Sequence, residues 1–134
     1  MTTVQDIYRF IDQIAPFAIQ ESWDNSGMLV GHWKQPVSRV LMTLDITPEV
    51  IYEARKLGAE LIVSHHPLLF QPAKQVTDGT QDLVGQRVLM LAEAGVAAIC
   101  CHTRSCVPSV TCFAGWNSSG WWETMSSAPS FRAS

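Results

Sequence analysis

Residues 61–70 have the sequence Leu61-Ile62-Val63-Ser64-His65-His66-Pro67-Leu68-Leu69-Phe70, an apolar run that leads into two adjacent histidines and a proline. The first residues of the run predict a buried strand, because short runs of branched apolar side chains fit a pleated sheet. Pro67 has no N–H to give to a strand ladder, so we expect the strand to end at the histidines. Both imidazoles are therefore predicted at the carboxyl end of a strand, where open α/β sheets place their ligand crevices.

His65 and His66 are candidate metal ligands, since neutral imidazole is the commonest protein ligand of transition metals. Adjacent strand residues point to opposite faces, so the two rings can meet at one site only if the backbone turns at His66. Pro67 favours such a turn because it fixes its own φ and restricts the residue before it. The alternative is a pair of loop histidines that bond to backbone and water.

Three helices are predicted where apolar residues recur at helical spacing, at residues 3–15, 48–57 and 82–94. Thr47-Pro48-Glu49 has the order of an N-cap, a first-turn proline and an acidic first turn. Gly58 and Gly95 are placed to end the second and third helices.

Three β-rich apolar runs predict strands, at residues 37–44, 61–64 and 96–101. The resulting β-α-β-loop-α-β order implies an α/β fold with a parallel sheet and right-handed crossovers. The ends of the strands, at Asp45, His65-His66 and His102, would then lie along one edge of the sheet.

Length and composition predict one globular domain. The chain has 134 residues, of which 47% are hydrophobic and 16% charged, and a net charge of −3. A negative net charge does not favour binding to nucleic acid or to an anionic membrane surface. No apolar run in the sequence is long enough to span a membrane. The N-terminal residues 1–6 lack the basic region of a signal peptide, so we expect a cytoplasmic protein. All four cysteines lie between residues 100 and 112, and the adjacent Cys100 and Cys101 are poor partners for each other, so we expect no secreted disulfide framework.

Four motifs in register resemble the Nif-three-like family, whose members are often catalogued as GTP cyclohydrolase 1 type 2 homologs. They are Ser22-Trp23-Asp24-Asn25-Ser26-Gly27-Met28-Leu29-Val30-Gly31, Leu44-Asp45-Ile46-Thr47, Leu61 to Phe70, and His102-Thr103. The resemblance covers residues 1–103 and implies the N-terminal portion of a layered α/β fold. It also implies a metal-dependent hydrolase with an unsettled small-molecule substrate, a site for two divalent ions such as zinc, manganese or iron, and a ring-shaped homo-hexamer. His65 and His66 correspond to metal ligands of the family.

Residues 104–134 depart from the family pattern. Cys106 stands where the family has an aspartate ligand, and the family's second half, with a distal histidine and glutamate pair, has no counterpart. The segment has eight serines, three tryptophans and no helical or strand period, so we expect it to be disordered. It is either a natural tail that docks on a partner or the product of a shifted reading frame. Reading Gly115–Thr124 from the third base of each codon allows an ordinary apolar segment, which favours a frameshifted, truncated and inactive product.

Other residues near the predicted edge have two interpretations. Asp45 is either an acceptor for a ligating imidazole or a turn residue, and His102 is either a crevice residue that shuttles protons or the end of a strand. Asp24 and Asn25 either shape the crevice mouth, as the resemblance implies, or belong only to a turn at Trp23–Gly27. His32 has no supporting neighbour and is expected at the surface.

Three functions from different classes follow from these observations. The first is a metal-dependent hydrolase in which paired ions activate a bridging water. The second is a non-catalytic module that binds metal or another protein. The third is a truncated product with no function of its own.

Overall fold

The computed structural model describes residues 1–14, 17–19 and 22–101. The elements in chain order are α1 (Val4–Ile14), a short 3-10 helix (Phe17–Ile19), β1 (Gly27–Val30), β2 (Val40–Thr43), α2 (Pro48–Leu57), β3 (Leu61–Ser64), α3 (Leu83–Ala94) and β4 (Ala97–Cys100). The predicted helices and strands are all present, although the strands expected at 37–44 and 96–101 are shorter than predicted.

The four strands form one sheet in the order β1-β4-β3-β2. β2, β3 and β4 run parallel, with Thr43 paired to Ser64 and Ser64 paired to Cys100 at their carboxyl ends. The predicted parallel α/β sheet is therefore confirmed, and its three parallel strands end at a common edge.

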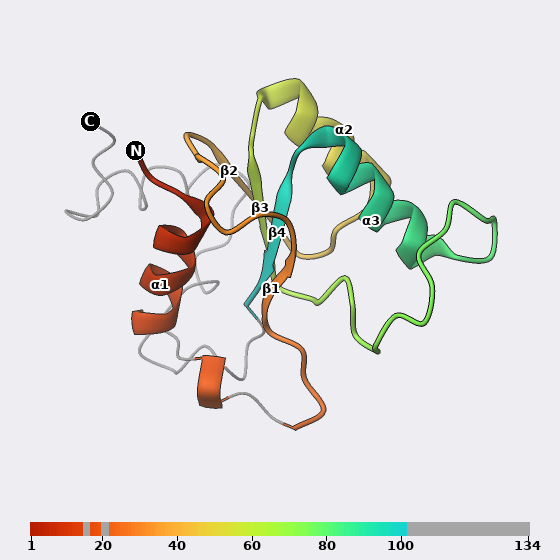
Figure 1. The fold of residues 1–134 in the computed structure, drawn as a ribbon, viewed down its shortest axis with the longest axis horizontal. Coiled ribbons are helices and arrows are strands. Elements are labelled where there is room, and N and C mark those ends of the chain that lie inside the picture. The colour runs from red at the N-terminus through yellow and green to blue at the C-terminus, as the bar shows by residue number, and fades with distance from the viewer. Residues whose placement is uncertain (15–16, 20–21, 102–134) are drawn as a thin grey trace.

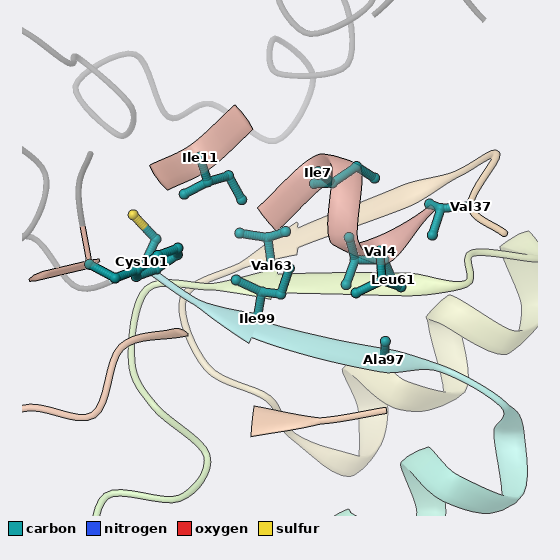
Figure 2. Packing of buried hydrophobic residues seen from close by; sticks show 10 residues of the cluster. Val4, Ile7, Ile11, Val37, Leu61, Val63, Ala97, Ile99 and Cys101 are labelled. Atoms are coloured by element: carbon teal, nitrogen blue, oxygen red, sulfur yellow. The ribbon is translucent and has the colours of Figure 1, made fainter. Parts of the chain in front are cut away.

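The helices lie in two layers, with α1 on one face of the sheet and α2 and α3 on the other (Figure 1). Alternate residues of the central strands supply the two faces, as the pleat requires. Leu61, Val63 and Ile99 pack with Val4 and Ile7 of α1 (Figure 2). The opposite cluster contains residues of β3 and β4 together with residues of both other helices: Ile62, Ala98, Ile51, Ala54 and Leu91. Both faces of the sheet are buried, which explains why these strands have continuous apolar sequences.

The helix ends follow the sequence signals. The Thr47 hydroxyl accepts a hydrogen bond from the Val50 N–H at the start of α2, and Gly58 ends that helix in the left-handed conformation. Asp82 caps α3 by accepting from the Gly85 N–H, and Gly95 repeats the left-handed ending. These caps determine where α2 and α3 end and therefore where β3 and β4 can begin.

Strand β1 was not predicted, because the sequence indicated only a turn at Trp23–Gly27. It runs antiparallel to β4, with Gly27 opposite Cys100. A four-residue strand that begins with glycine and is followed by Gly31 shows too few alternating positions to be recognised. Gly31 has a φ of +123°, and a Cβ there would lie 2.6 Å from the Cβ of Ala97. Glycine therefore allows the end of β1 to approach β4 closely.

Among the described residues, no helix is both long and apolar enough to cross a membrane.

Candidate metal site at the carboxyl edge of the sheet

The edge where β2, β3 and β4 end brings Asp45 and the two histidines together. Asp45 lies two residues after β2, and His65 directly follows β3. The parallel register pairs the last residue of β2 with the last residue of β3, so the segments that follow them are neighbours. His102 was predicted at this edge too, but it lies outside the described residues.

The two imidazoles lie on the same side of the chain, with ring centroids 4.7 Å apart. Neighbouring residues of a regular strand point to opposite faces, so the backbone has left the pleat at this point. His65 is partly buried and His66 is exposed. The turn that the sequence indicated at His66 is present, and the pair can face one ligand.

The hydrogen bonds of the backbone show how the turn is made. The His65 N–H donates to the Thr43 carbonyl at 3.0 Å, as expected for a continuing β2–β3 ladder. In a regular ladder the His66 N–H would then point toward β4, but it donates to the Leu44 carbonyl at 2.9 Å. The peptide unit that joins His65 and His66 is therefore reversed relative to the ladder.

Asp45 contacts His66 directly. Its Oδ1 lies 2.8 Å from Nδ1 of His66, and both side chains are at least half exposed. A carboxylate only accepts hydrogen bonds, so this contact assigns the ring proton to Nδ1. In neutral His66 the lone pair is then on Nε2, which is the tautomer that a ligating histidine with a carboxylate partner adopts.

The loop before β1 reaches the same region because β1 is antiparallel to β4. The Asn25 side-chain amide donates to the carbonyl of Leu69, which ties this loop to the segment that follows the histidines. The half-exposed rings of Trp23, in this loop, and Phe70, in the segment after the histidines, are also neighbours, with centroids 6.4 Å apart. Oδ1 of Asp24 accepts from the Asn25 N–H, so Asp24 and Asn25 stabilise the loop in this structure.

Sequence reasoning missed two contributors to the edge, Ser64 and Cys100. The Ser64 hydroxyl donates to the His66 carbonyl at 2.8 Å, and the Cys100 thiol donates to the His65 carbonyl at 3.4 Å. A serine in an otherwise apolar strand was a visible signal for the first. No local sequence pattern points to Cys100, because its role depends on the register of β3 and β4.

The donor set fits one part of a metal site. Two imidazoles face the same region, and one of them has a carboxylate that fixes its tautomer. Within the part of the chain that the structure describes, no three side chains of His, Cys, Asp or Glu are grouped so that they could hold an ion. His32 is exposed, as predicted, while Cys106 and the segment 104–134 lie outside the described residues.

Comparison with known proteins gives a consistent set of matches. The Duf34/NIF3 (NGG1p interacting factor 3) family matches residues 2–105. A GTP cyclohydrolase 1 type 2 homolog of Clostridium perfringens is 39% identical over 101 residues, which are 75% of this chain and 38% of that protein. One of Campylobacter jejuni is 47% identical over 77 residues, 58% of this chain and 31% of that protein. The crystal structure of a Staphylococcus aureus protein is similar, with a TM-score of 0.72 and 34% identity over 77% of this chain and 33% of that one. The chain thus spans about a third of the length of each of these proteins.

Proposed function

Because the chain belongs to the Duf34/NIF3 family, we propose that His65 and His66 form the imidazole part of a divalent-metal site in a metal-dependent hydrolase. The observation that carries this proposal is the 2.8 Å contact between His66 Nδ1 and Asp45 Oδ1. It leaves Nε2 as the ligating nitrogen of His66, and it fixes the orientation of the ring. The neighbouring ring of His65 supplies the second nitrogen ligand.

Each residue of the edge has a distinct role in this proposal. His65 and His66 hold the ion, and Asp45 orients His66 without binding the ion itself. The loop that contains Asp24 and Asn25 borders the site through its link to Leu69. A bound zinc, manganese or iron ion would lower the pKa of a coordinated water and so supply hydroxide for hydrolysis.

The chain alone is proposed to bind metal weakly and to lack catalysis. Zinc sites usually have three or four protein ligands, whereas the described residues bring together two imidazoles. Further ligands would come from outside the described residues. For a protein of this family that carries the further ligands, we propose a small-molecule substrate, a cytoplasmic location and a homo-oligomeric ring. Relatives named GTP cyclohydrolase 1 type 2 homologs make GTP the first substrate to assay.

Calorimetric titration of the full chain with zinc and with manganese tests the metal site. Wild type should bind zinc weakly, and His65→Ala and His66→Ala should abolish that binding. Asp45→Asn should weaken zinc binding about tenfold, the lower end of the usual effect of removing such a partner. His32→Ala and Asp78→Asn are matched controls, because both remove an exposed side chain of the same type elsewhere on the surface.

A turnover assay on GTP and simple phosphoesters accompanies the titration. Activity no higher than background, with excess zinc or manganese, supports the proposal that catalysis requires ligands beyond His65 and His66. Tight binding of two ions by the wild-type chain, or activity that disappears in His65→Ala, would show instead that these 134 residues build a complete site. Zinc binding that survives both histidine substitutions would refute the metal site itself.

A further inference from the structure

We propose that Ser64 and Cys100 are positioning residues that hold the His65–His66 turn in the conformation in which both rings face one site. This inference rests on the proposed metal role of the two histidines. Its structural content is independent of that role, because it concerns the arrangement of the rings in the metal-free chain.

The two side chains take up two successive carbonyl groups. Cys100 Sγ donates to the His65 carbonyl at 3.4 Å, and Ser64 Oγ donates to the His66 carbonyl at 2.8 Å. Ser64 and Cys100 are themselves paired across β3 and β4, and both are fully buried. One cross-strand pair therefore serves both peptide units of the turn.

The reversed peptide explains why the His65 carbonyl meets a side-chain donor on the β4 side. In a continuing ladder the His65 carbonyl would point toward β2 and the His66 N–H toward β4. Here the N–H has moved to Leu44 on the β2 side, so the carbonyl points the other way and meets the side chain of Cys100. The thiol is a weak donor, and it bonds to a carbonyl that points away from β2.

Ser64 fixes the second half of the turn. Its hydroxyl reaches the carbonyl two residues later, which closes a small ring over His65 and limits rotation of both histidine backbones. The Ser64 backbone remains in the sheet, since its own carbonyl accepts from the Cys101 N–H at 2.8 Å. The turn is thus anchored to a residue that cannot move without disturbing the centre of the sheet.

The test compares variants that keep or remove each donor. Ser64→Ala and Cys100→Ala remove the donors, whereas Ser64→Thr and Cys100→Ser keep a hydroxyl at the same position. Cys101→Ala is the matched control, because it removes a neighbouring buried thiol that packs in the cluster on the α1 face. If Ser64→Ala does not fold, Ser64→Val against Ser64→Thr gives the same comparison between two side chains of equal shape.

The first readout is the contact between the two rings in the metal-free full chain, observed as nuclear Overhauser effects between histidine ring protons. Ser64→Ala and Cys100→Ala should lose this contact, and the hydroxyl-bearing variants should keep it. The second readout is zinc affinity, which should fall about fivefold for Ser64→Ala, the equivalent of one net hydrogen bond. Cys101→Ala should lower the urea midpoint while leaving the ring contact and zinc affinity intact.

The outcomes separate the two proposals. Loss of the ring contact in a chain that binds no zinc would support the positioning role and refute the metal site. An unchanged ring contact in both Ser64→Ala and Cys100→Ala would overturn the positioning role whatever the chain binds.

Discussion

The substitution Gly31→Ala tests how closely the end of β1 packs against β4. The new Cβ would lie 2.6 Å from Ala97 Cβ and 2.9 Å from Ala97 Cα, closer than carbon atoms approach. Ala97 is fully buried in β4, so the clash cannot be relieved by a flexible side chain. The φ of +123° at Gly31 is also a conformation that alanine rarely adopts.

Two costs add in this variant. Forcing an extra methyl group into a packed position costs about 1 to 3 kcal/mol, and a disfavoured φ costs about 1 to 3 kcal/mol more. The expected loss in the free energy of unfolding is therefore about 2 to 6 kcal/mol, compared with a total free energy of unfolding of about 5 to 15 kcal/mol for a typical domain. Gly31→Ala should lower the urea midpoint of the full chain by at least about 1 M, followed by circular dichroism.

Gly95→Ala is the matched control, because Gly95 also has a positive φ, of +67°, but a Cβ there meets no atom within 4 Å. It should cost only about 1 to 2 kcal/mol, the penalty of the left-handed conformation. Equal midpoints for the two variants would refute the close approach of β1 to β4, and with it the placement of the loop at Asp24 and Asn25.

Two further predictions concern the helix cap and a carboxylate at the opposite edge of the sheet. Thr47→Ala should destabilise the chain by about 1 kcal/mol in urea unfolding, because α2 loses its N-cap. Thr47→Ser keeps a capping hydroxyl and should retain the stability of the wild type. Burial raises the pKa of Glu60, but hydrogen bonds from Arg39 and Ser38 outweigh it and hold the pKa below its usual 4.5. The stability that comes from this depressed pKa is present above pH 4.5 and is lost as the pH falls through the folded pKa. Glu60→Gln should therefore make the free energy of unfolding less dependent on pH between about pH 5 and 3. A pH profile as steep as that of wild type would contradict the assignment.

The sequence was sufficient to predict the parallel core, and the reasons are local. Thr47 with Pro48 and Gly58 delimits α2, and the apolar runs on both sides of it indicate strands. β1 could not be predicted, because its pairing with β4 depends on glycine and on a contact between residues 71 positions apart, Met28 and Ile99.

The candidate site also has a part that the sequence predicts and a part that it does not. The position of His65 and His66 at a strand end followed from Pro67, and the nearness of Asp45 followed from the order of parallel strands. The reversed peptide and its donors could not be predicted, because they depend on the register that places Cys100 beside Ser64. The antiparallel register of β1 on β4 pairs Gly27 with Cys100, which brings the Asn25 loop to the histidines.

The most direct test of the metal site is a zinc titration of the full chain with ¹⁵N-labelled histidine, followed by the chemical shifts of the ring nitrogens. We predict saturable changes at His65 and at Nε2 of His66, with Nδ1 of His66 still protonated against Asp45 and His32 unaffected. Shifts that are as large at His32 as at the pair, or zinc bound at Nδ1 of His66, would contradict the account.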